Sequence, residues 1–174
     1  MVVYKLLFVF ITSLLLSVTS YANEQIYRFG PGDTIRVSVY LESDLYFEGQ
    51  ISQQGSIDFP LLGSLTLKGL TQQEAKHFIE QQLKDGYLVS PNVSVRIVSY
   101  RPFFIYGEVR KPGSYPYQPN ITLEQAIVLA GGLKDRASRE QWTIQRGEKS
   151  NIFKASADSI VQPGDVIKVE KSFF

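Results

Sequence analysis

The stretch Gly30-Pro31-Gly32-Asp33 decides where the fold begins, because it precedes a clean alternation of apolar and polar residues from Thr34 to Tyr40. Proline presets φ at the second position of a β-turn, glycine supplies a positive φ at the third, and aspartate bonds its local backbone. A near copy, Pro163-Gly164-Asp165, also leads into an alternating stretch. The repeated turn predicts two β-rich modules. We expect both aspartates to act as backbone partners within the turns, without a chemical role.

Residues 1–22 have the layout of a secretory signal peptide. Lys5 is their one charged residue, and the run from Leu6 to Val18 is apolar apart from hydroxyl residues. Ser20 and Ala22 place small residues before Asn23, so we predict cleavage between Ala22 and Asn23. The alternative is an uncleaved membrane anchor, for which the run is shorter than the roughly 20 residues of a spanning helix. Mass spectrometry of the purified protein would distinguish the two.

The composition narrows the class of protein. The chain has 174 residues, with 18 basic and 17 acidic side chains, so loss of Lys5 with the signal leaves no net formal charge. Such a chain has no overall field to attract nucleic acid, and we expect no nucleic-acid partner. There is no cysteine, so we expect neither disulfides nor a lipid anchor. Hydrophobic residues form 44% of the chain, which is typical of a globular protein and not of a disordered one.

A helix is the clearest element of the first module. Thr71 is a natural N-cap, and Glu74, three residues later, completes a capping box. Gly86 is placed to end the helix. The apolar residues that recur at helical spacing on one face are Ala75, Phe78, Ile79 and Leu83.

Alternating stretches surround this helix. They are Thr34 to Tyr40, a hairpin-like stretch from Ile51 to Pro60 with Gly55 at its turn, Leu65 to Lys68, and, after the helix, Val93 to Val98. The order predicts a β-β-α-β domain over residues 23–100, in which one helix packs on a sheet.

The second module, residues 101–174, shows the same mixture of elements. Thr122 caps a short helix with Gln125 as its capping-box partner, and Gly131-Gly132 is suited to end it. The predicted strands are Phe103 to Tyr106, Tyr115 to Tyr117 after a turn at Lys111-Pro112-Gly113, Trp142 to Ile144, Ile152 to Phe153, and the residues after Asp165. Strands around one short helix in so small a module predict a β-grasp fold, so the whole chain is assigned to the α+β class.

An ordered set of turn motifs, more specific together than any one alone, carries a family resemblance. The motifs are Tyr27 to Asp33, Gly55, Pro60 to Gly63, Gly69 to Thr71 and Pro91 to Val95, then Gly107 to Val109, Pro112 to Tyr115, Ala130 to Gly132, Arg146 and Pro163 to Asp165. The first module resembles the polysaccharide export domain, and the second resembles a soluble-ligand-binding β-grasp (SLBB) domain. The chain is similar to proteins that export capsular polysaccharide or exopolysaccharide from Gram-negative cells.

The resemblance implies a non-enzymatic part of an export machinery. It implies a homo-oligomeric ring that passes the polysaccharide through its lumen, and an inner-membrane polysaccharide co-polymerase as partner. The sequence departs from larger members of the family, because it lacks a lipidated cysteine, has one β-grasp module and ends at Phe174, directly after its last strand. We therefore expect a periplasmic ring, associated with the outer membrane, that docks beneath a separate pore protein. Phe173 and Phe174 are a candidate docking point, with a disordered tail as the alternative.

Few residues of the sequence are candidates for a ligand-binding or catalytic site. Tyr100, Phe103, Phe104 and Tyr106 are candidate contacts for sugar rings, although only one alternate set of a strand can face away from the core. The family-motif turn residues, expected to be structural, are Gly30, Pro31, Gly32, Asp33, Pro112, Gly113, Gly131, Gly132, Pro163, Gly164 and Asp165. We expect no catalytic residue, no metal site and no cofactor.

Two features that suggest an enzyme have simpler interpretations. His77, the single histidine, lies on the predicted helix away from its apolar face, which favours a solvated residue over a triad member. Glu42, Asp44 and Glu48 offer the carboxylate pair of a glycosidase, but such spacing is common in loops. The alternatives to a conduit are thus a periplasmic glycan-binding module that forms none and, more remotely, a hydrolase. A stable ring would support the conduit, and a monomer with glycan affinity would support the binding module.

Overall fold

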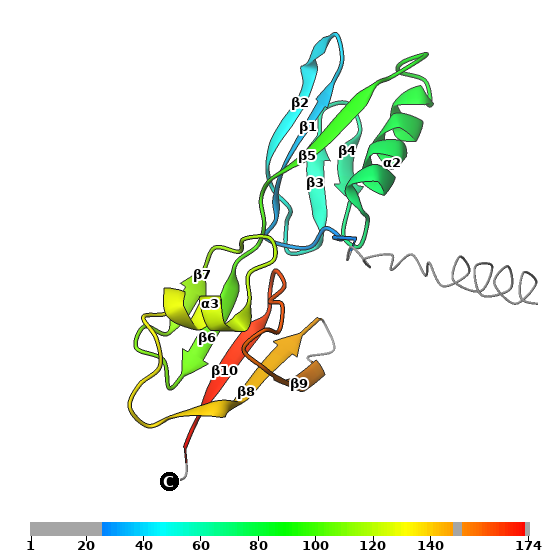
Figure 1. The fold of residues 1–174 in the computed structure, drawn as a ribbon. Helices are drawn as coiled ribbons and strands as arrows, with labels where there is room; N and C mark the ends of the chain where they lie inside the picture. Colours follow the sequence, from blue (N-terminus) through cyan, green and yellow to red (C-terminus); the bar gives the residue numbers. More distant parts are fainter. Residues whose placement is uncertain (1–25, 148–150, 173–174) are drawn as a thin grey trace, which may run out of the picture.

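The computed structural model describes residues 26–147 and 151–172, and the chain folds into two modules that follow one another (Figure 1). One connection, between strands β5 (Val93–Ser99) and β6 (Phe103–Gly107), joins them. The predicted signal peptide and the two terminal phenylalanines lie outside the described residues. Within the described part of the chain, no helix combines the length and hydropathy that crossing a membrane requires.

The first module is built on a three-stranded antiparallel sheet. β1 (Thr34–Val39) lies in its centre, with β2 (Glu42–Gln50) on one side and β5 on the other. A separate antiparallel hairpin is formed by β3 (Ser56–Phe59) and β4 (Gly63–Thr66). Inward side chains of the sheet and of this hairpin share one hydrophobic core.

Helix α2 (Gln72–Lys84) closes that core. The predicted capping box is confirmed: the Thr71 hydroxyl accepts from the Glu74 amide at 3.1 Å, and the Glu74 carboxylate accepts from the Thr71 amide at 2.8 Å. These bonds satisfy two of the free amides at the helix start. Gly86 adopts φ +91 just after the helix, as expected of a residue that ends it. The helix buries Ala75, Ile79 and Leu83 against the core.

The second module is a five-stranded mixed sheet in the order β7-β6-β10-β8-β9. Its strands are β6, β7 (Gly113–Tyr115), β8 (Ala137–Arg146), β9 (Asn151–Ala155) and β10 (Val166–Lys171). The central pair, β6 and β10, is parallel, and the other pairs are antiparallel. Helix α3 (Leu123–Leu129) begins at the predicted N-cap Thr122 and covers one face of the sheet (Figure 1). Together the two modules confirm the α+β class.

One strand, β2, occupies a segment that the sequence analysis treated as a loop with an acidic cluster. Glu42, Asp44 and Glu48 lie on this edge strand, while Leu45 is buried and Phe47 packs on the core. Two apolar residues at a spacing of two were the missed signal. A second correction concerns the hairpin: Gly55 does turn, with φ +85, but the paired strands are β3 and β4, not the two halves of residues 51–60.

Candidate functional site

The first turn does more than start β1, because its aspartate is the buried centre of a polar cluster. The Asp33 carboxylate is fully buried and accepts hydrogen bonds from the Gly30 amide at 2.7 Å and from the Tyr27 hydroxyl at 2.5 Å. It also accepts from the Arg101 amide at 2.8 Å and from the Arg101 guanidinium at 3.1 Å. These four hydrogen bonds satisfy the oxygens of the buried carboxylate. The cluster ties the start of the first module to the connection between β5 and β6.

Arg101 also reaches the turn of the second module. Its Nε donates to the carbonyl of Pro163 at 3.2 Å, and the Gly164 amide donates to the carbonyl of Pro102 at 3.1 Å. A Cβ at Gly164 would lie 2.8 Å from Nε of Arg101, and a Cβ at Gly30 would clash with the same guanidinium. The arginine side chain therefore lies between the two turns, and both glycines leave room for it.

Aromatic rings also pack at the junction between the two modules, beside Arg101. The Tyr100 ring packs edge-to-face on Tyr27, with centroids 4.9 Å apart, and on Tyr117 of the second module at 5.2 Å. Burial, together with the hydrogen bond to Asp33, raises the pKa of Tyr27 far above its ordinary value. The phenol is thus held neutral as a donor to the carboxylate.

The second turn has its own arginine. Arg146 forms a bidentate pair with the fully buried Asp165, with Nε–Oδ1 and Nη2–Oδ2 distances of 2.8 and 2.7 Å. The Gln162 amide donates to the same carboxylate at 2.7 Å, and Gly164 adopts φ +85. All these partners are internal, which supports a structural role for the turn.

The remaining turn residues of the prediction lie at ends of elements. Gly131 and Gly132 adopt φ +80 and +85 after α3, where their amides bond carbonyls of the last helical turn. Gly113 begins β7, directly after Pro112. No sequence signal pointed to Arg101, since its partners are 62 to 74 residues away along the chain.

The four aromatic residues proposed for sugar contact do not act as one group. Phe103 is completely buried in the core, so it is withdrawn as a contact. Tyr100 is engaged in the junction between the modules. Phe104 and Tyr106 lie on the outward side of β6, and each is 45% exposed. The alternation of the strand separates the two sets.

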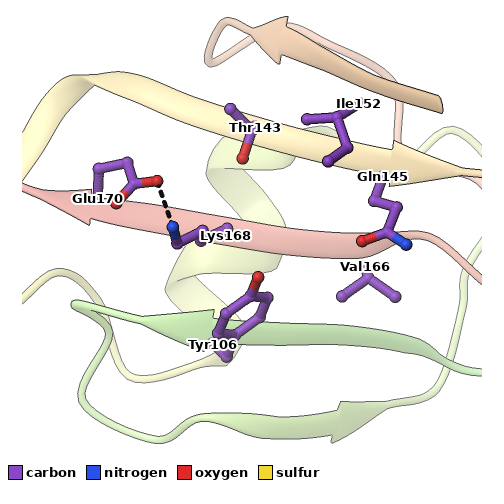
Figure 2. Close-up of a pocket in the computed structure, with 7 residues that line it drawn as sticks. All are labelled: Tyr106, Thr143, Gln145, Ile152, Val166, Lys168 and Glu170. Carbon is purple, nitrogen blue, oxygen red and sulfur yellow. Dashed lines mark ion pairs between the residues drawn. The ribbon is translucent and has the colours of Figure 1, made fainter. Parts of the chain in front are cut away.

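Tyr106 belongs to a pocket on the face of the second sheet that α3 leaves open (Figure 2). The pocket has a volume of ≈ 270 Å³ and is lined by Tyr106, Thr143, Gln145, Ile152, Val166, Lys168 and Glu170. Tyr106 lies opposite Lys168, which in turn lies opposite Thr143 and pairs with Glu170 at 2.6 Å. An aromatic ring beside hydroxyl, amide and charged groups can pack on the C–H face of a sugar and bond its hydroxyls.

The first sheet also has an open face, which sequence reasoning missed. Arg36 and Ser38 of β1 lie directly opposite Arg96 and Ser94 of β5, and the four side chains line a pocket of ≈ 240 Å³. Glu48 of β2 bonds Arg36 at 2.7 Å, and this hydrogen bond lowers the pKa of the carboxyl. The signal was the set of polar residues that alternates with the buried valines of both strands.

Within residues 26–147 and 151–172, no group of three or more histidine, cysteine, aspartate or glutamate side chains could hold a metal ion. The His77 side chain is 62% exposed on α2, within 2.9 Å of Gln73. This agrees with the solvated position expected of it.

Comparison with known proteins gives the same two modules. Residues 21–98 match the family model described as polysaccharide biosynthesis/export protein, and residues 102–154 match the SLBB domain. The exopolysaccharide production protein ExoF of Rhizobium meliloti is 32% identical over 87% of this chain and 38% of its own length. The EPS I polysaccharide export outer membrane protein EpsA of Ralstonia nicotianae is 26% identical over 83% of this chain and 47% of its own.

A third relative is the polysialic acid transport protein KpsD of Escherichia coli, 27% identical over 72% of this chain and 24% of its own length. The chain thus spans between about a quarter and about a half of the length of the curated relatives it matches. The order of the two domains and these relatives together show that the chain belongs to the family of polysaccharide export proteins.

Proposed function

We propose that the protein is a non-enzymatic component of a machinery that exports capsular polysaccharide or exopolysaccharide. It assembles as a homo-oligomeric ring in the periplasm, associates with the outer membrane and receives polymer from an inner-membrane co-polymerase. The observation that carries the proposal is the export domain followed by an SLBB domain in one chain. The relatives named for polysaccharide export and transport support the same role.

The junction at Arg101 fits this role. A ring needs every subunit to present its two modules at the same angle, or the symmetry cannot close. Arg101 bonds both turns, and the Tyr27–Tyr100–Tyr117 contacts brace the same connection. A connection with these internal bonds holds the modules in one orientation, which favours a closed assembly.

Deletion and complementation in the source cell test the proposal. Loss of the protein is expected to remove polysaccharide from the cell surface and to leave polymer inside the envelope, and the full chain is expected to restore export. Native mass spectrometry of the purified protein should show a closed oligomer of fixed subunit number. Normal surface polysaccharide in the deletion strain would reject the export role.

A glycan-binding module that forms no conduit is the second candidate. The open face with Tyr106 and the exposed Phe104 favours it. Tyr106→Ala should then weaken binding of the exported polymer to a monomeric protein, whereas Leu61→Ala, a change at an exposed apolar residue of the first module, should not. A monomer whose glycan affinity depends on Tyr106 would favour this candidate over the ring.

A further inference from the structure

We propose that the open face of the first sheet binds carboxylate groups of an acidic polysaccharide through Arg36 and Arg96. The proposal rests on the proposed role in export and adds the chemical class of the polymer. It concerns the strands β1, β2 and β5, on the module that lacks the aromatic pocket of Figure 2.

The site is built by the register of two strands. Arg36 lies directly opposite Arg96, and Ser38 lies directly opposite Ser94, so two guanidinium groups and two hydroxyls share one small area. Side chains that face each other on antiparallel strands have Cβ atoms about 5 Å apart. Both arginines are exposed and both serines are half-buried, so the groups are held in place by the sheet and open to solvent.

The charges of this area do not balance. Like charges directly opposite on neighbouring strands are unfavourable. Glu48 compensates Arg36 at 2.7 Å and also accepts from the Tyr46 hydroxyl, whereas no hydrogen bond or ion pair from the described residues reaches the Arg96 side chain. Asp44, further along β2, makes no ion pair with either arginine. Two guanidinium groups facing one carboxylate leave one positive charge for a ligand to neutralise.

The chemistry suits a carboxylate carried by a sugar. A guanidinium binds a carboxylate through two parallel hydrogen bonds, a geometry specific for planar anions. Hydroxyls both donate and accept, so Ser38 and Ser94 can bond the hydroxyls around a sugar carboxylate. The pocket lies on a sheet face, where an extended polymer can continue beyond it.

Calorimetric titration of the purified chain with galacturonic acid oligosaccharides tests the site. The matched ligand is the same oligosaccharide as its methyl ester, which keeps the sugar and removes the charge. We expect the acid to bind and the ester to bind at least about tenfold more weakly, as loss of a charge-assisted hydrogen bond implies. Affinity for the acid should also fall with added salt.

Three variants locate the binding. Arg96→Gln should weaken binding of the acid about tenfold. Glu48→Gln should strengthen it, because it releases Arg36 from its partner. Arg110→Gln is the matched control, since it removes an equal charge from an exposed arginine outside both sheet faces. Unchanged melting temperatures would show that the variants fold.

Several results would overturn the proposal. Equal binding of acid and ester, no binding of either, or equal effects of Arg96→Gln and Arg110→Gln would each reject the site. A change of oligomeric mass in Arg96→Gln with unchanged oligosaccharide affinity would assign Arg96 to a contact with a second copy. The export role is decided separately by the deletion strain, so failure here leaves that test unaffected.

Discussion

Two buried aspartates organise this molecule at the scale of single residues. Asp33 and Asp165 have no exposed surface, and each carboxylate accepts from at least one backbone amide and from an arginine. Their partners differ in origin, because Arg146 belongs to the same module as Asp165, whereas Arg101 stands between the modules. The same turn motif therefore stabilises one module in one case and joins two in the other.

Valine at the third position of either turn should destabilise the protein. Gly32 and Gly164 adopt φ +93 and +85, a region that a β-branched residue enters only with strain. We expect Gly32→Val and Gly164→Val to lower the free energy of unfolding by about 1–3 kcal/mol in denaturant titrations. Gly113→Val is the control, because Gly113 is extended in β7 with no atom near its Cβ position. Three unchanged midpoints would contradict the assigned turn type.

The half-buried phenol of Tyr27 should make the protein sensitive to alkaline pH. Burial and the hydrogen bond to Asp33 raise its pKa above the ordinary 10.0, so the folded state favours the neutral phenol. This stabilisation is complete below about pH 10 and is lost as the pH rises from there towards the raised pKa.

The measurement compares wild type with Tyr27→Phe. The free energy of unfolding of the wild type should fall more steeply above about pH 10, since the variant has no proton to lose at this position. Other tyrosines and lysines titrate in both proteins and cancel in the comparison. Parallel pH profiles would show that the Tyr27 phenol is not linked to folding.

At the scale of elements, short helices depend on their caps. Helix α3 has seven residues and lies over the second sheet. The Gln125 amide donates to the Thr122 hydroxyl at 3.3 Å, and the Thr122 amide donates to the Gln125 side chain at 3.0 Å. A helix this short is not stable by propensity alone. Its position therefore rests on the capping box and on three buried side chains, Leu123, Ala126 and Ile127.

Removing that cap should weaken the second module selectively. Thr122→Ala is expected to lower the free energy of unfolding by about 1 kcal/mol, the usual cost of losing an N-cap hydroxyl. Thr122→Ser retains the hydroxyl and should stay close to wild type. Hydrogen exchange, read for each module, should show faster exchange in α3 but not in α2. An alanine variant as stable as the serine variant would mean that packing alone holds the helix.

At the scale of the whole molecule, the orientation of the modules depends on Arg101. Its guanidinium is 28% exposed and bonds Asp33, Tyr27 and the carbonyl of Pro163. These three partners belong to both modules, so the Arg101 side chain bonds both turns. Loss of these bonds leaves the chain connection and the tyrosine contacts to orient the second module.

Arg101→Ala should therefore uncouple the modules. We expect its calorimetric unfolding to separate into two transitions, with a loss of about 1–3 kcal/mol because the buried Asp33 carboxylate loses its ion pair. Small-angle scattering should show a broader range of particle dimensions than for wild type. Arg110→Ala, an exposed arginine of the second module, is the control. A variant with wild-type scattering and one transition would show that the aromatic contacts alone fix the orientation.

Much of the local structure was readable from the sequence because its causes are local. The capping boxes at Thr71 and Thr122, and the positive φ at Gly32 and Gly164, depend on residues within one turn of the chain. Strand β2 was not predicted, because charged residues on this edge strand hide the alternation of Leu45 and Phe47. The alternation of a strand predicted that only one set of the four aromatic residues faces away from the core, and the structure places Phe103 inside and Phe104 and Tyr106 outside.

By itself, the sequence determined the α+β class, the helix boundaries, the two turns and the family resemblance, all of which follow from short-range patterns and their order. Tertiary structure alone decided which partners meet. Arg101 bonds Asp33 and Pro163, which are 68 and 62 residues away, and Arg36 faces Arg96 through strand register. Neither pairing has a local signal, because the positions of distant side chains are set by the packing of the sheets, and only the folded chain brings them together.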